Sequence, residues 1–164
     1  MRVPFLFLTA ALAAAPLLAQ SVQDVGLTMD GGLLTVIYGQ ACGPFSCTPR
    51  VAGNVAAAQP RVVVVYGAPV QIYVLAIDLA NSAPCFAFPG IANSLVLGVQ
   101  PFTLAIGILG PGGVIGACQQ GRAPYSLLFP LGTPSGVQFQ LQALAMSPTQ
   151  NVPAFTIALQ ATTQ

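Results

Sequence analysis

The sequence predicts an all-β protein: a single antiparallel β-sandwich of about seven to nine short strands, preceded by a cleaved signal peptide. Three observations support this prediction. Apolar and polar residues alternate with a period of two near the end of the chain, Gly and Pro interrupt the longer apolar runs, and the chain opens on an apolar stretch. Apolar residues make up 55% of the 164 residues and charged residues only 4%, which indicates a folded core rather than a disordered chain.

The opening residues have the pattern of a secretory signal. Arg2 is the only charge before an apolar run that ends in Leu17-Leu18-Ala19. Because Pro16 would hinder cleavage just before it, we expect cleavage after Ala19. The run is shorter than the ~20 residues that span a bilayer, so we expect no membrane span after signal cleavage.

The predicted organisation has three parts, and the protein is expected to be secreted, whether extracellular, at the cell surface or in the periplasm. The parts are a signal peptide at 1–19, an N-terminal arm at 20–32 and a β-sandwich domain at 33–164.

The clearest strands lie near the end of the chain. Gln138, Gln140 and Gln142 alternate with apolar residues, which predicts a strand with glutamines outward and apolar side chains inward. The segment from Phe155 onward repeats the pattern, and the turn-forming residues 147–153 separate the two, so we expect an antiparallel pair. Earlier strands are predicted at Leu33–Tyr38, Arg61–Tyr66, Val70–Leu79, Ser94–Val99 and Phe102–Ile108.

Four cysteines in an exported chain favour two disulfides. We expect Cys42–Cys47 and Cys85–Cys118, although the sequence permits all three connectivities. A zinc site is disfavoured because the chain has no His and no Glu, and its Cys-x-x-x-x-Cys spacing does not match a redox pair. We therefore expect neither a metal nor a cofactor.

The ionisable side chains exclude several chemistries. With no His and no Lys, the chain can form neither a Ser-His-Asp triad nor a P-loop. A glycosidase would need two of Asp24, Asp30 and Asp78, of which the first two lie in the predicted arm and the third ends a strand. We therefore expect no enzyme. A calcium site at Asp24 and Asp30 is less favoured than a simple turn, because Asp30 precedes two glycines.

The charge balance also limits the partners. Cleavage of the signal would leave three Arg and three Asp, which cannot supply the clustered cations that nucleic acids require. Few charges are left to guard the edges of sheets against pairing. We therefore expect a non-catalytic secreted structural or interaction domain that self-associates in a surface layer, matrix or filament, or contacts other cell-surface components.

An extracellular carbohydrate-binding module is the alternative function. Such modules usually stack sugar rings on exposed aromatic side chains. The polar aromatic residues of this chain are Tyr38, Tyr66, Tyr73 and Tyr125.

From about Gly39 onward the chain resembles a small secreted domain that is common in exported proteins of planctomycete-type bacteria. The resemblance implies a secreted β-sandwich with no established activity, and it carries over no functional residue. We expect the chain to depart from that pattern by standing alone behind a signal peptide, and it has the extra cysteines Cys47 and Cys85. The matching segments are Tyr38-Gly39-Gln40-Ala41-Cys42, Thr48-Pro49, Leu95-Val96-Leu97-Gly98, Gly116-Ala117-Cys118, Gln138-Phe139-Gln140-Leu141-Gln142-Ala143-Leu144 and the final strand from Ala154.

Overall fold

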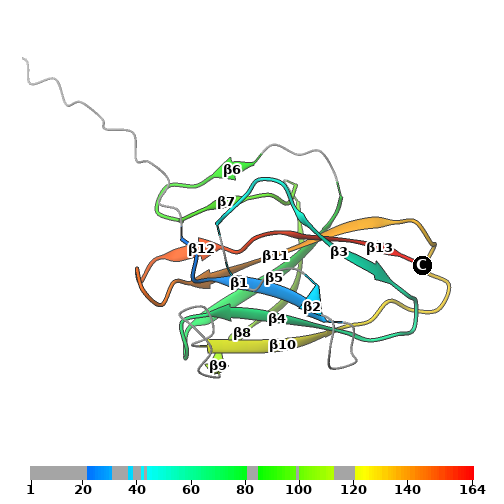
Figure 1. Ribbon diagram of the computed structural model, residues 1–164, viewed down its shortest axis with the longest axis horizontal. Coiled ribbons are helices and arrows are strands. Elements are labelled where there is room, and N and C mark those ends of the chain that lie inside the picture. Colours follow the sequence, from blue (N-terminus) through cyan, green and yellow to red (C-terminus); the bar gives the residue numbers. More distant parts are fainter. Residues whose placement is uncertain are drawn as a thin grey trace, which may run out of the picture.

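The fold is a sandwich of two β-sheets, shown in a computed structural model (Figure 1). Among the described residues there are strands and turns but no helix, so none could cross a membrane as an apolar helix. The predicted all-β sandwich is therefore confirmed. The structure describes residues 22–30, 37–38, 42, 44–80, 85–98, 100–112 and 121–164.

The first sheet, called sheet A, is antiparallel throughout, with strand order β2-β1-β4-β10-β9. Its central strand β4 is a run of valines, whose β-branched side chains suit a pleated surface. Its strands are β1 (Gly26–Asp30), β2 (Ile37–Tyr38), β4 (Arg61–Gly67), β9 (Gly110–Pro111) and β10 (Gly121–Leu127).

The second sheet, called sheet B, has the order β3-β13-β11-β5-β8, and β12 also pairs with β11. The expected antiparallel pairing of the last two segments is found between β11 and β13, whereas β13 and β3 run parallel. Its strands are β3 (Arg50–Val55), β5 (Ile72–Leu79), β8 (Phe102–Ile108), β11 (Gln138–Met146), β12 (Pro153–Phe155) and β13 (Leu159–Thr163).

The main core lies between the two sheets. Alternate residues of β4 and β11 point into it, and full burial of an aliphatic or aromatic side chain stabilises a fold by about 1.5–3 kcal/mol. The rings of Phe129 and Phe139 meet there, with centroids 5.0 Å apart. The larger fully buried side chains of this core include Leu27, Met29, Leu75, Leu109, Phe139, Leu141 and Leu159.

A separate segment covers part of the outer face of sheet B. Residues 85–98, here called the cover segment, contain β6 (Phe86–Ala87) and β7 (Ser94–Leu95), which pair with each other (Figure 1). The side chain of Gln142 joins the segment to the sheet: its Nε2 donates to the carbonyls of Ser94 (2.9 Å) and Thr156 (2.8 Å), and its Oε1 accepts from the amide of Val96 (2.8 Å). The outer face thereby gains a small second core around Leu97.

This segment changes the expectation for the glutamines of β11. Gln140 and Gln142 do point away from the main core, as predicted, because the alternate residues Phe139 and Leu141 belong to that core. The two glutamines are nevertheless buried, at 3% and 1% exposure. Alternation in a single strand reports which way a side chain points, but not whether a distant segment covers it.

Each of the seven expected strands has a counterpart in the structure, although most of their ends differ. Phe102–Ile108 has the predicted bounds, while the expected Leu33–Tyr38 strand is described only at Ile37–Tyr38, and the Ser94 strand is two residues long. Strands β1, β3 and β10 were not expected from the sequence, and the Gly, Arg and Pro residues of β10 are unusual in a strand. Strand β10 packs closely against the turn after β4, since a Cβ on Gly121 would lie 2.7 Å from the backbone of Pro69.

Candidate functional site

Asp24, considered above as a catalytic or calcium-binding group, has a scaffold role. It is buried before β1, and its Oδ2 accepts hydrogen bonds from the hydroxyl of Ser147 (2.9 Å) and from the amide (2.9 Å) and hydroxyl of Thr149. These bonds tie the start of the described chain to the turn after β11. The other carboxylate oxygen, Oδ1, is buried and has no hydrogen-bond partner among the described residues. The side chain of Asp30 lies outside the described residues.

Asp78 also serves the scaffold. Its Oδ1 accepts from the amide of Leu79 and its Oδ2 from the amide of Gly98, both at 2.8 Å. The second bond anchors the end of the cover segment to β5. Asp24 and Asp78 therefore contact different parts of the fold, and no group of three or more metal-ligating side chains occurs in the described part of the chain.

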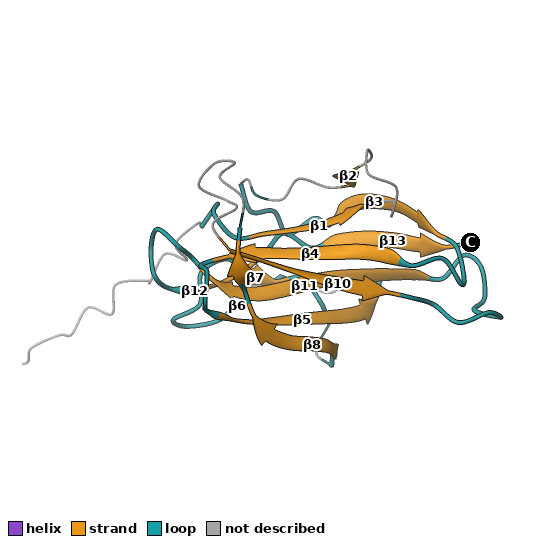
Figure 2. Cartoon of the chain, turned by 90° about the horizontal axis from the view of Figure 1, so that it is seen from below, coloured by secondary structure: helices purple, strands orange, loops and turns teal. Residues whose placement is uncertain are grey.

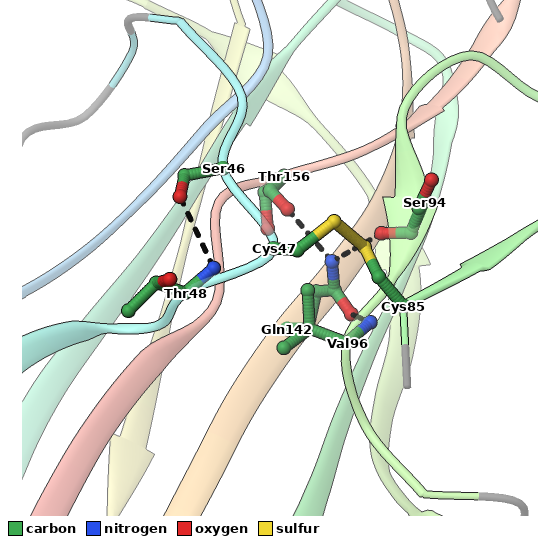
Figure 3. The surroundings of a disulfide bond; sticks show 8 residues. All are labelled: Ser46, Cys47, Thr48, Cys85, Ser94, Val96, Gln142 and Thr156. Atoms are coloured by element: carbon green, nitrogen blue, oxygen red, sulfur yellow. Dashed lines mark hydrogen bonds between the residues drawn. A yellow bond between two sulfur atoms is a disulfide. The ribbon is translucent and has the colours of Figure 1, made fainter. Parts of the chain in front are cut away.

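The structure corrects the disulfide prediction. Cys47 is bonded to Cys85, with their Cα atoms 5.5 Å apart, so the expected Cys42–Cys47 and Cys85–Cys118 pairs are wrong (Figure 3). Cys42 is itself disulfide-bonded, and Cys118 lies outside the described residues. The pairing follows from the fold: Cys47 precedes the edge strand β3, and Cys85 opens the cover segment that lies on the same sheet. This bond fits folding in an oxidising environment.

The tyrosines considered for sugar stacking point in different directions. Tyr73 is buried in the core, and Tyr125 packs against the core as the partner of Val63. Tyr66 lies beside Arg122 on the other face of sheet A and is half-buried. The side chain of Tyr38 lies outside the described residues. These three side chains form no common platform, and carbohydrate binding stays a prediction.

The most unusual surface lies on sheet B, beyond the cover segment. Direct pairing places Ile72 opposite Ile108 and Val74 opposite Ile106, so these side chains share the outer face. Gly107 between the two isoleucines lies on the core side, where a Cβ would be 2.9 Å from the ring of Tyr73. We call this the β8 surface. Its large exposed side chains, between 63% and 76% exposed, are Val70, Ile72, Ile106 and Ile108.

The same region ends in an open strand edge. Figure 2 shows β8 as the outermost strand of sheet B, and within the described residues only β5 pairs with it. Residues 68–77 and 100–112 include no charged side chain. Natural sheets usually protect such an edge with charges, prolines, bulges or shortness. One bulge does occur, opposite Leu75 and Ala76, and it leaves Ala105–Ile108 regular.

Within the described residues, the other three edges of sheets A and B are protected. In sheet A they are β2 and β9, of two residues each, and β9 contains Pro111. At the far edge of sheet B, β3 begins with Arg50, contains Gly53 at a φ of 94°, and pairs with a register shift. Among the edges of sheets A and B, as far as they are described, β8 is therefore the long and uncharged one, which makes it the candidate interaction site.

Strand β8 was expected from the sequence, but its position at the edge of the sheet was not. The sequence does contain a pattern that could have indicated an exposed strand, since Ile106 and Ile108 flank a glycine in a strand without charge. Comparison of the chain with protein-family models, curated proteins and solved structures finds no match. The resemblance to the planctomycete-type domain stays a prediction.

Proposed function

We propose that this protein is a non-catalytic, exported structural domain that associates through the β8 surface. The observation that carries the proposal is the group of four large apolar side chains exposed beside an open strand edge. Contiguous apolar surface of this kind marks interaction sites in proteins that are otherwise soluble. Assembly in a layer, matrix or filament is the function that such a surface serves.

Export is part of the proposal. The apolar N-terminal run, the expected cleavage after Ala19 and the Cys47–Cys85 disulfide support it together, because disulfides persist mainly in oxidising compartments. The small number of charges supports a structural role in the same way. Neutral faces can approach one another without the cost of removing water from ions.

Sedimentation velocity of the oxidised protein over a range of concentrations tests the proposal. We expect association that Ile106→Lys weakens by at least about tenfold, which corresponds to about 1.4 kcal/mol. Leu131→Lys is the matched control, because Leu131 is 84% exposed in the loop after β10 and its substitution should leave association unchanged. Both variants should keep the wild-type melting temperature, since exposed positions contribute little to stability.

The proposal would be contradicted if the protein stayed monomeric at high concentration and bound no component of the cell surface. Equal weakening by both lysine variants would also count against it, because that result would reflect net charge rather than the β8 surface.

A further inference from the structure

The direction of the backbone hydrogen bonds along β8 identifies which residues are available for pairing. The amide of Leu109 donates to the carbonyl of Gln71 at 2.9 Å, so Leu109 faces β5. In an antiparallel pair, residues alternate between bonding to the neighbour and facing away. Gly107 and Ala105 therefore bond toward β5, and the N–H and C=O groups of Ile106 and Ile108 point to the open edge.

Open backbone groups of this kind require an extended strand as their partner. A strand meets two donors and two acceptors on alternate residues, whereas an apolar ligand would leave them unpaired. The edge carries no charge that would repel a second copy of itself. Moreover, residues 105–109 are symmetric about Gly107, with an isoleucine on either side and an alanine or leucine beyond.

We infer that the partner of the β8 surface is a second copy of the chain, whose β8 pairs antiparallel with this one about a two-fold axis at Gly107. This inference rests on the proposed function and names its partner. The axis places Ile106 of each copy opposite Ile108 of the other, in hydrogen-bonded pairs that satisfy all the open groups of both residues. Sheet B then continues across the two molecules.

The side chains suit this arrangement. The four isoleucines of the two copies meet on the outer face, flanked by Ile72 and Val70 of each copy. Four large side chains that are each about two-thirds exposed offer a few hundred Å² per copy, and the paired backbones add to this area toward the ~800 Å² per partner of a standard interface. On the axis itself, a glycine suits the close approach of Cα atoms, ~4.5 Å, in a non-hydrogen-bonded pair.

Disulfide trapping tests the register. In a hydrogen-bonded antiparallel pair the Cα atoms are ~5.5 Å apart, a distance that a disulfide spans. The full oxidised chain carrying Ile106→Cys is mixed with the chain carrying Ile108→Cys, each bearing a different mass label, and the mixture is oxidised gently. We expect the mixed 106–108 disulfide to exceed either like-with-like product several-fold, because the latter join diagonal positions. Ile106→Cys mixed with Leu131→Cys is the control and should give only background.

The outcomes separate this inference from the proposed function. Association that Ile106→Lys weakens, without preference for the mixed disulfide, overturns the β8–β8 register and leaves the proposed surface standing. A strict monomer whose Ile106 and Ile108 amides resist hydrogen exchange means that the chain covers its own edge, which overturns both. A monomer that binds a cell-surface component through Ile106 keeps the proposed surface and removes the second copy as partner.

Discussion

Single residues hold together parts of this protein that are far apart in the chain. Asn93 is the best example: its Oδ1 accepts from the amide of Val22 (3.0 Å), and its Nδ2 donates to the carbonyls of Val22 (3.0 Å) and Phe155 (2.7 Å). The side-chain amide thereby links two backbone segments through hydrogen bonds like those between strands. Its own backbone has a φ of 61°, which asparagine tolerates better than most residues.

Two substitutions at Asn93 separate these two roles. Asn93→Gly keeps the backbone conformation but leaves the buried groups of Val22 unpaired, so we expect a loss of about 3 kcal/mol in the free energy of unfolding. Asn93→Ala should cost about 1 kcal/mol more, because alanine is strained at positive φ. Urea unfolding measures both. Equal losses would mean that the backbone conformation contributes nothing, and the exposed Gln138→Ala is the control.

Val70 shows strain at the proposed interaction surface. It has a φ of 63°, rare for a β-branched residue, and its side chain is largely exposed. Val70→Asn should therefore raise the free energy of unfolding by about 1 kcal/mol, since asparagine adopts this conformation more easily. The same change should weaken self-association, because it removes an apolar side chain from the β8 surface.

The two effects of Val70→Asn are measured by urea unfolding of dilute protein and by sedimentation of concentrated protein. Ala58→Asn is a suitable control, because Ala58 also has a positive φ, 58°, but lies in the turn between β3 and β4. It should stabilise the fold without changing association. Stronger association of the Val70 variant would contradict the role given to this residue.

Among the elements, the cover segment depends on few contacts. Five backbone or side-chain groups anchor it: the amide of Val96 and the carbonyl of Ser94 on Gln142, the amide of Gly98 on Asp78, the side chain of Asn93, and the backbone of Ala92 on β12. Phe88 adds a ring contact to Phe155, with centroids 6.0 Å apart. The Cys47–Cys85 disulfide therefore has an important share in keeping the segment on the sheet.

Removal of that disulfide should loosen the cover segment before the rest of the fold. Closing a loop with a sequence separation of 38 stabilises by about 4 kcal/mol on the chain-entropy estimate. In the Cys47→Ser/Cys85→Ser variant we expect a loss of that order, and faster hydrogen exchange at the Val96 and Gly98 amides than at the amides of β4. Ser46→Ala, next to the disulfide, is the control. Uniform acceleration over the whole chain would show that the cover opens only with global unfolding.

Local patterns predicted individual strands well, and pairings between distant segments poorly. The valines of β4 predict a strand, the alternation in β11 predicts which side chains face the core, and both strands were found. Strand β10 was missed because Arg122 and Pro124 face outward from a strand whose first inner residues, Gly121 and Ala123, are small. The cover over Gln140 and Gln142, the parallel β3–β13 pair and the open edge of β8 all depend on tertiary neighbours, which no local pattern contains.

For the whole molecule, the disulfides and the lack of charge act together. The chain has only three lysines or arginines after Arg2, so electrostatics contributes little to solubility, and covalent links help to keep its neutral sheets folded. Of its four cysteines, Cys47 and Cys85 are paired with each other, and Cys42 is disulfide-bonded. We therefore predict that Cys42 pairs with Cys118, the one cysteine that remains in the sequence.

Digestion without reductant tests this pairing cleanly, because the chain has no lysine. Trypsin cleaves after Arg50, Arg61 and Arg122, which places Cys42 and Cys47 in one peptide and Cys85 and Cys118 in another. With the predicted pairs the two peptides stay joined until reduction. Further cleavage after Phe45 and within 86–117 should then give one product containing Cys42 and Cys118 and another containing Cys47 and Cys85. Tryptic peptides that separate without reductant would contradict both pairs, since only Cys42–Cys47 with Cys85–Cys118 leaves them unlinked.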